Sequence, residues 1–408
     1  MQVLVINSGS SSVKYKIFSM PEEALLAAGR VENIGIGNSG SKAVLIQNHP
    51  DLAQFREEFH CTDHADAVSR ILAFLNTAVS GLPGGIAEVG IVGHRVVHGG
   101  TRFSKPVIIS DDVLAGLEQL TGLAPLHIPL NVACITACME ILPETPMAAC
   151  FDTAFFHDLP HQSRFYPVPM EWYDKYGIRR YGFHGISYEY VTAEAADQLG
   201  QPPDRLKIIA AHLGNGSSIM AFDRGRVLDT SMGFTPLEGL MMGTRSGDFD
   251  PAVFPYIMEK TNMSVERILD TLNTRSGLLG ISGVSRDMRE IEAQMDAGNP
   301  RARLAFDMFV HILRKYLGAY FFSLAGADAV VFTGGIGENA SRVREAVFAP
   351  LGDLGLLLDP DKNRAVTGGQ AGWIHADASR TKVLVIPAEE ERMIARSAFQ
   401  VALQDTFG

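Results

Sequence analysis

The sequence KIIAAHLGNGSSIMAFDRGRVLDTSM, residues 207–232, alternates three β-rich apolar runs with two short turns. The first turn consists of Gly, Asn and Ser, and the second is centred on Arg224 and Gly225, which are residue types that reverse the chain between strands. The stretch therefore predicts strand, turn, strand, tight turn and strand. Residues 1–18, MQVLVINSGSSSVKYKIF, repeat the first half of this pattern. Two related halves are expected.

The segments around these stretches alternate between strand and helix patterns. Strands are expected at 3–7, 13–18, 43–47, 88–92, 147–152, 329–332 and 382–386, and helices at 65–79, 111–120, 128–141, 303–324 and after the last strand. Apolar residues recur at helical spacing in the helices, whereas Val, Ile and aromatic residues mark the strands. This order predicts an α/β fold.

The chain has 408 residues, about two or three common domain lengths, so at least two hydrophobic cores are expected. About the first 150 residues are expected to form one domain, and most of the remainder another. Because no linker rich in Pro or Ser separates them, we expect the domains to abut along a cleft, a usual place for a ligand.

Composition excludes several classes of function. The net charge of -11 argues against a nucleic-acid partner, because binding to phosphate backbones requires a basic surface. The four cysteines, Cys61, Cys134, Cys138 and Cys150, are too few and too irregularly spaced for a disulfide framework or a zinc site. Cys134 and Cys138 are expected to lie one helical turn apart as buried small residues.

The sequence also predicts a cytoplasmic protein without a membrane span. Its first residues form a strand pattern with neither a basic segment nor a cleavage site. The most apolar stretches, 122–142 and 316–335, are interrupted by His127, Pro129, Asn131 and Asp328.

Familiar phosphate-binding signatures are missing or misplaced. The P-loop pattern GxxxxGK[ST] and the protein-kinase HRD and DFG arrangements do not occur. A GxGxxG pattern occurs at Gly35, Gly37 and Gly40, but it lacks the strand-to-helix setting of a dinucleotide site, and a loop is expected there.

Three other turns of small residues, 7–12, 212–218 and 334–339, each follow an apolar strand. Glycine lets the backbone approach an anion, and successive N–H groups with Ser hydroxyls can donate to phosphate oxygens. One such turn would be an ordinary hairpin, but three favour a nucleotide held from both domains. Lys14, shortly after the first turn, could point at a phosphate or lie in solvent.

Four residues are candidates for binding charge. Arg95 in GHRVVHGG is expected just after a strand, Asp152 in FDTAFF at the end of one, His184 in YGFHG between aromatic and glycine residues, and Arg245 in GTRSGDFDP in a loop. Asp152 could also be a helix N-cap, His184 a buried core residue and Arg245 a surface ion pair. As a set they favour phosphoryl transfer, which needs cationic donors around the phosphoryl oxygens, a metal and an in-line acceptor. Asp152 and the carboxyl-terminal glutamates would supply metal or acceptor contacts.

At these residues the chain resembles the acetate kinase (acetokinase) family, within the superfamily of acetate and sugar kinases, Hsp70 and actin. The shared strings run in family order: NSGSSSVK, GHRVVHGG, PLH, FDTAFF, RYGFHG, HLGNGSS, DTSMGFTPLEGLMMGTRSGDFDP, GLLGISGVSRDMRE, FTGGIGEN and IPAEEE. The resemblance implies two related α/β domains of the ribonuclease H-like type flanking a nucleotide cleft. These are an N-terminal domain of 1–151, joined by a C-terminal helix of 388–408, and a nucleotide-binding domain of 152–387.

The resemblance also implies roles for individual residues. Arg95 would hold the acceptor carboxylate, Asp152 would be the essential active-site acid, and His184 and Arg245 would stabilise the transferring phosphoryl group. Asn7 and Glu390 would bind magnesium. The implied acyl pocket consists of Val97, Leu126, Phe183 and Pro236. The implied ATP site consists of Lys14, His212, Leu213, Gly214, Asn215, Gly216, Asp287, Met288, Arg289, Gly335, Ile336, Gly337, Glu338 and Asn339.

Two departures from the family pattern affect these assignments. Ile128 stands in PLHIP where the family has PLHNP, which removes a polar group near the acyl pocket. AEEER at 388–392 replaces a TNEEL-like string, so Glu389 and Glu391 compete with Glu390 as the metal ligand.

The function implied is reversible, Mg²⁺- or Mn²⁺-dependent transfer of the γ-phosphoryl group of ATP to acetate, giving ADP and acetyl phosphate. A kinase of propionate or another short-chain acid is the nearest alternative, since one methylene changes binding by only about 1–3 kcal/mol. An Hsp70-like or actin-like nucleotide-gated binding module is an alternative of another class. The resemblance further implies a cytoplasmic homodimer, with neither nucleic acid nor membrane as a partner.

Overall fold

The computed structural model describes residues 1–35, 42–49 and 52–407. The chain forms two compact units: unit 1 comprises Met1–Phe155 and Glu389–Gly408, and unit 2 comprises Phe156–Ala388. Of the glycines in the GxGxxG pattern, Gly37 and Gly40 lie outside the described residues.

Unit 1 is built on a mixed sheet of eight strands in the order β5-β4-β3-β2-β1-β6-β8-β7. Its strands are β1 (Gln2–Ser8), β2 (Ser12–Ser19), β3 (Ala24–Glu32), β4 (Ala43–His49), β5 (Leu52–Phe59), β6 (Val89–Val96), β7 (Val107–Ile108) and β8 (Met147–Phe151). Its α-helices are α1 (His64–Leu75), α2 (Asp111–Gln119), α3 (Ile128–Ile141) and α15 (Glu390–Phe407).

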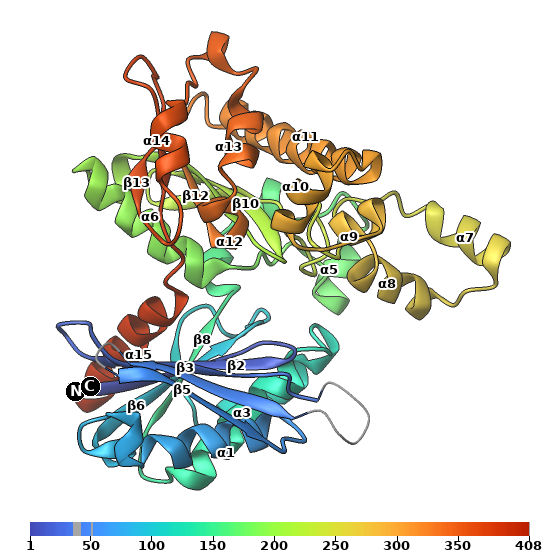
Figure 1. The fold of residues 1–408 in the computed structure, drawn as a ribbon. Helices are drawn as coiled ribbons and strands as arrows, with labels where there is room; N and C mark the ends of the chain where they lie inside the picture. The colour runs from blue at the N-terminus through green and yellow to red at the C-terminus, as the bar shows by residue number, and fades with distance from the viewer. Residues whose placement is uncertain (36–41, 50–51, 408) are drawn as a thin grey trace. The chain divides into compact units, whose positions relative to one another are not determined.

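Helices cover both faces of the central strands of unit 1. Helix α15 covers one face, against β1, β6 and β8, and α1 and α3 cover the other (Figure 1). Strand β6 permits the close approach of α15 at Gly93, where a Cβ atom would lie 2.8 Å from Ile394 Cγ2. Glu23 fastens the same helix, because its carboxylate accepts from Arg396 Nε at 2.6 Å and from Arg392 Nη1 at 3.1 Å. The carboxyl-terminal segment is therefore an integral part of unit 1.

Unit 2 contains a six-stranded mixed sheet in the order β11-β10-β9-β12-β14-β13. Its strands are β9 (Lys207–Leu213), β10 (Ser217–Asp223), β11 (Arg226–Thr230), β12 (Ala329–Thr333), β13 (Gly372–Trp373) and β14 (Lys382–Val385). Its α-helices are α4 (His161–Arg164), α5 (Met170–Tyr176), α6 (Gly185–Leu199), α7 (Val253–Thr261), α8 (Val265–Thr274), α9 (Gly277–Ser282), α10 (Met288–Asp296), α11 (Pro300–Ser323), α12 (Gly334–Asn339), α13 (Ser341–Phe348) and α14 (Pro360–Ala365).

The six strands of the sheet in unit 2 share their topology with six of the eight strands in unit 1. In unit 1, β1, β2 and β3 form an antiparallel meander, β6 and β8 follow β1 in parallel, and β7 closes the edge antiparallel. In unit 2, β9, β10 and β11 form the same meander, β12 and β14 follow in parallel, and β13 closes the edge. The α/β class and the two related halves predicted from the sequence are confirmed.

The structure corrects three predicted elements. The helix expected over 65–79 ends at Leu75, where the Thr77 hydroxyl donates to the carbonyl of Phe74 and competes with further helical bonding. The strand expected over 88–92 continues to Val96, so Arg95 lies within β6 rather than after it.

The third correction concerns 334–339, which is helix α12 rather than a turn. Gly334 follows β12 with φ of +75°, and a Cβ atom there would lie 2.8 Å from the carbonyl oxygen of Leu213. The left-handed residue alone reverses the chain, so the residues after it are free to wind into a helix.

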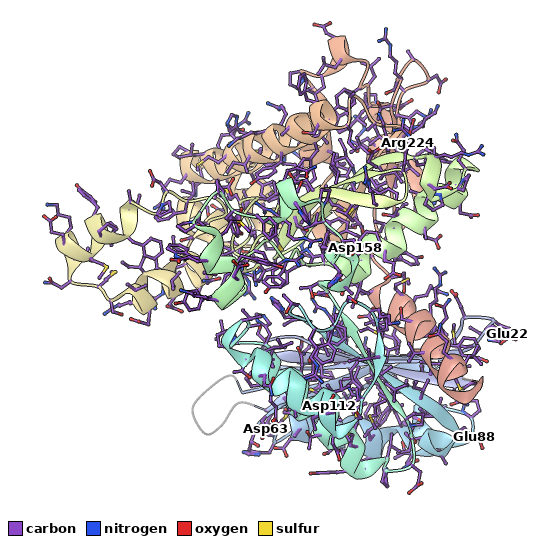
Figure 2. The ribbon with its side chains drawn as sticks, turned by 180° about the vertical axis from the view of Figure 1, so that it is seen from behind. Glu22, Asp63, Glu88, Asp112, Asp158 and Arg224 are labelled. Atoms are coloured by element: carbon purple, nitrogen blue, oxygen red, sulfur yellow. The ribbon has the colours of Figure 1, made fainter. Side chains whose placement is uncertain are left out.

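The charged side chains labelled in Figure 2 lie on the outside of their units. Five of those labelled in Figure 2 are acidic (Glu22, Asp63, Glu88, Asp112 and Asp158) and one is basic (Arg224), and all six are exposed. Cys134 and Cys138 lie one turn apart on α3 as buried free thiols, as predicted. Within the described residues, none of the helices has the length and apolar character needed to cross a membrane.

Candidate active site

In unit 1, an ion pair between the partly buried Arg95 and the buried Asp152 joins the ends of two parallel strands. Arg95 of β6 donates from Nη2 to Asp152 Oδ2 at 2.6 Å and from Nε to Oδ1 at 3.1 Å. Asp152 follows β8 immediately and is only 1% exposed. Burial raises the pKa of Asp152, and the paired guanidinium of Arg95 opposes that rise. The two residues form a rigid, planar, charge-assisted pair.

Asn7, near the end of β1, connects this pair to the carboxyl-terminal glutamates. Its amide oxygen accepts from Arg95 Nη1 at 3.3 Å. Its amide nitrogen lies 2.9 Å from Glu391 Oε1 and 3.4 Å from Glu390 Oε2. The structure therefore brings together Asn7, Arg95, Asp152 and Glu390, which lie far apart in the sequence.

Lys16, which the sequence interpretation missed, distinguishes the three competing glutamates. Its Nζ lies 2.8 Å from Glu389 and 3.4 Å from Glu391, and these carboxylates raise its pKa against the lowering effect of burial. Glu389 and Glu391 therefore both form ion pairs with Lys16. Glu391 is also buried. The negative charges of Glu390 and Glu391 both act to raise the pKa of Arg95, and that of Glu390 also acts to raise the pKa of Asp152.

The donor atoms around Asn7 suit a hard divalent cation. In the part of the chain that is described, no three or more His, Cys, Asp or Glu side chains are grouped to hold a metal ion. Mg²⁺, however, usually takes only one or two carboxylates and completes its octahedron with water and substrate phosphates. Asn7 and Glu390 supply oxygen ligands of that type, and Mn²⁺ accepts the same ligands. In this structure the amide oxygen of Asn7 accepts from Arg95 and its nitrogen faces Glu390, so joint binding of a metal requires the Asn7 amide to rotate.

Other predicted residues of unit 1 differ in exposure. Lys14 is exposed on β2 and pairs in register with Asn7, so both side chains leave the same face of the sheet. Val97 is buried, whereas the side chain of Leu126 is 69% exposed. Ile128 is fully buried at the start of α3, so any effect it has on an acceptor would act through packing.

In unit 2, three separate segments converge on one pocket of about 570 Å³. Its walls come from the β9–β10 turn, the start of α10, and α12 with the residue after it. Lining residues that were predicted are Gly214, Asn215, Asp287, Met288, Arg289, Gly335, Ile336 and Asn339, and lining residues that were not predicted are Arg286, Glu292 and Ala340. The volume is typical of a site for a small organic ligand.

The remaining residues of the predicted nucleotide set do not line this pocket. Leu213 is fully buried in β9, and Gly337 is buried within α12. Glu338 turns away, because its Oε1 accepts from the backbone N–H of Ala388 at 2.9 Å. His212 stacks on His184 at 4.2 Å between ring centroids, and Gly216 lies beside that ring.

Glu292 gives the pocket a polar group suited to a ligand donor. Its Oε1 is buried, and no described group donates to it. Burial is the main cause of its raised pKa. A carboxylate oxygen left in this state favours a ligand hydroxyl or amino group as its partner. One signal could have identified Glu292: it lies one helical turn after Met288 on the same face of α10.

Arg344, which the sequence analysis also did not identify, hydrogen-bonds to the backbone of α12. Its side chain is fully buried, and Nη1 donates to the carbonyl oxygens of Gly337 and Glu338, each at 2.8 Å. Its other nitrogens donate to Asn363 and to the carbonyl of Val366. These bonds fix the helix that forms one wall of the pocket.

His184 and Arg245 meet over Gly216, at the end of the β9–β10 turn. A Cβ atom built at Gly216 would lie 3.4 Å from both His184 Nε2 and Arg245 Nη1. His184 has φ of +62°, an uncommon conformation for a residue other than glycine. Arg245 Nη1 donates to the carbonyl of Pro236 at 3.3 Å. Two hydrogen-bond donors predicted to serve the same group are therefore neighbours.

The predicted acyl-pocket residues fall in both units. Val97 and Leu126 belong to unit 1, whereas Phe183, which is buried, and Pro236, which is half-buried, belong to unit 2. Their joint role stays a prediction.

Comparisons with known proteins agree over nearly the whole chain. The model of the acetokinase family matches residues 2–396. The acetate kinase of Carboxydothermus hydrogenoformans is 46% identical over 403 residues, covering 99% of this chain and 100% of that one. The crystal structure of Porphyromonas gingivalis acetate kinase has a TM-score of 0.91 at 42% identity, covering 98% of this chain and 99% of that one. A propionate kinase from Francisella tularensis has a TM-score of 0.90 at 38% identity, also covering 98% of this chain and 99% of that one.

The geometry of the pocket predicts the effect of filling it. A Cβ atom at Gly335 meets nothing within 4 Å, so Gly335→Leu should place its side chain in the pocket without disturbing the fold. We expect the Kd for ADP, measured by isothermal titration calorimetry, to rise at least about tenfold, or about 1.4 kcal/mol.

Gly318→Leu is the matched control, because Gly318 lies on the exposed side of α11 and a Cβ atom there also meets nothing within 4 Å. It should leave ADP binding unchanged. Equal affinities for the two variants would show that the pocket does not take the nucleotide.

Proposed function

The chain belongs to the acetokinase family, and we propose from this premise that it catalyses the reversible transfer of the γ-phosphoryl group of ATP to acetate, giving acetyl phosphate and ADP. The resemblance predicted from its motifs is confirmed by the family match over residues 2–396. The chain is thus a phosphotransferase with a carboxyl group as acceptor. The nucleotide-gated binding module, the alternative of another class, has no support in this family assignment.

The observation that carries the proposal for this chain is the ion pair of Arg95 and Asp152. Asp152 engages Nε and Nη2 of the guanidinium and so fixes its plane, and Nη1 is directed toward Asn7. A planar guanidinium recognises a carboxylate or a phosphate better than a lysine would. We assign Arg95 to the acceptor carboxylate and Asp152 to the orientation of Arg95.

The proposed reaction needs no general base. A carboxylate such as acetate is already ionised near neutral pH, so one of its oxygens attacks the γ-phosphorus while the bond to the β-phosphate oxygen of ADP breaks. No proton has to be removed from the acceptor. The demands on the protein are therefore orientation of the acceptor and stabilisation of charge on the transferring group.

We assign the stabilising role to His184 and Arg245. Their nitrogens approach one spot over Gly216, where a phosphoryl oxygen could accept from both. The residues that line the pocket of unit 2 would hold ADP and ATP, with Lys14 near the phosphates. Transfer then requires the residues of unit 1 that hold the acceptor and those of unit 2 that hold the nucleotide to act on one phosphoryl group.

We assign Mg²⁺, or Mn²⁺, to Asn7 and Glu390. The metal ion would neutralise charge on the nucleotide phosphates. Glu389 and Glu391 pair with Lys16, which leaves Glu390 as the glutamate for this role. The proposal also includes a cytoplasmic homodimer that binds neither nucleic acid nor membranes and supplies acetyl phosphate for acetyl-CoA synthesis.

Trapping of the acyl phosphate tests the function. The purified protein with ATP and Mg²⁺ should convert acetate to a species that hydroxylamine captures as acetohydroxamate, while ADP forms in equal amount. Propionate and butyrate, assayed in parallel, test the alternative favoured by the structural likeness to a propionate kinase. A hydroxamate yield highest with propionate would replace acetate as the substrate, and no hydroxamate with any acid would refute the proposal.

The metal assignment predicts different defects for neighbouring glutamates. Glu390→Gln should weaken Mn²⁺ binding at least about tenfold, measured by electron paramagnetic resonance with ADP present, and leave Tm unchanged. Glu391→Gln should instead lower stability by roughly 1–3 kcal/mol, because Lys16 and Asn7 lose a buried charged partner. The reverse pattern would assign the metal to Glu391.

A further inference from the structure

A chain of buried hydroxyl groups stands behind His184. Its Nδ1 lies 2.9 Å from Ser218 Oγ, and Ser218 Oγ lies 2.6 Å from the phenolic oxygen of Tyr188. Ser218 is on β10 and Tyr188 on α6, and both side chains are fully buried. The proposed reaction assigns no role to either residue.

The direction of these hydrogen bonds follows from counting protons. Burial strongly favours the neutral phenol by raising the pKa of Tyr188, so its oxygen keeps its hydrogen. The opposite direction, with Ser218 donating to the phenolic oxygen, would leave the buried hydroxyl hydrogen of Tyr188 without a described side-chain acceptor. The hydroxyl hydrogen of Tyr188 is therefore directed to Ser218 Oγ, its side-chain partner.

Ser218 then has one hydrogen and one remaining neighbour. Having accepted from Tyr188, its hydroxyl donates to His184 Nδ1. An imidazole nitrogen that accepts a hydrogen bond carries no proton, so in the neutral ring the proton is on Nε2.

The environment of the other side of the ring is consistent with this arrangement. His184 Nε2 and Arg245 Nη1 approach the same position over Gly216, and His212 stacks on the ring with its Nδ1 paired to Ser187 at 2.8 Å. A neutral imidazole adds a hydrogen-bond donor beside Arg245 without placing a second full positive charge there.

We propose that Tyr188 and Ser218 are positioning residues that donate in series to His184 Nδ1, so that the neutral imidazole presents its Nε2–H as a donor to the transferring phosphoryl group. The inference rests on the proposed function for the identity of the group that receives this hydrogen bond. The tautomer itself follows from the contacts among Tyr188, Ser218 and His184.

Nuclear magnetic resonance of the ¹⁵N-labelled histidine rings reads the tautomer directly in the nucleotide-free protein. The signals of His184 among the 12 histidines are assigned by their loss in His184→Gln. At pH about 8, where an ordinary imidazole is neutral, we expect the proton of His184 on Nε2. A ring protonated on Nδ1 would overturn the proposal, whatever the variants do.

Three variants test the consequence for turnover in the acyl phosphate assay. Ser218→Ala should lower kcat at least about tenfold with little change in either KM, as when the hydrogen-bond partner behind a functional histidine is lost, and should mix the two tautomers. Tyr188→Phe should have a smaller effect, because Ser218 keeps a hydrogen to donate. Thr192→Val is the matched control: its hydroxyl is buried one turn further along α6 without a described partner.

Wild-type kcat in Ser218→Ala, or an equal loss in all three variants, would contradict the proposal. If the wild-type protein formed no acyl phosphate at all, the proposed function would fail, and the ring spectrum of His184 would still decide whether the hydrogen-bond chain exists.

Discussion

The ion pair between the partly buried Arg95 and the buried Asp152 is the constraint on which the proposed acceptor site depends. A carboxylate that is 1% exposed needs a charged partner, and Arg95 supplies it with two hydrogen bonds from the neighbouring strand. The pair fixes the plane of the guanidinium. Asn7 and the start of α15 lie next to it, because Asn7 accepts from Arg95 and donates to Glu390.

The repeated topology explains why functional residues are so dispersed along the chain. In each sheet the first strand of the meander, β1 or β9, is parallel to the strand on its other side, β6 or β12. The turn after the first strand and the end of that parallel strand therefore meet at one edge of the sheet. In unit 1 that edge carries Asn7, Arg95 and Asp152. In unit 2 it carries the β9–β10 turn and α12, which form walls of the pocket that we propose for the nucleotide. One architectural unit, used twice, thus provides the sites proposed for the acceptor and for the nucleotide.

Much of this was predictable from the sequence, because apolar strands ending in Gly, Asn, Asp or Ser are visible without a structure. Asn7 and Asp152 were identified in this way, as was the turn at Gly214 and Asn215. The helical form of 334–339 was missed because its glycines resemble a phosphate-binding turn. Lys16, Arg344 and Tyr188 were missed for another reason: their roles depend on strand register and helix packing, which leave no local signature. Glu292 was missed although its helical spacing from Met288 is visible in the sequence, and Ser218 was expected to donate to a phosphate rather than to His184.

The most direct test concerns the planar guanidinium group of Arg95. Arg95→Lys keeps a positive charge beside Asp152, so the fold is preserved, but it removes the planar pair of donors. We expect kcat/KM for acetate to fall at least about 100-fold, or about 2.7 kcal/mol, while the Kd for ADP stays within about twofold of the wild type, because the nucleotide pocket belongs to unit 2. Near-normal kcat/KM for acetate, or a loss of ADP binding of the same size, would contradict the assignment of Arg95 to the acceptor.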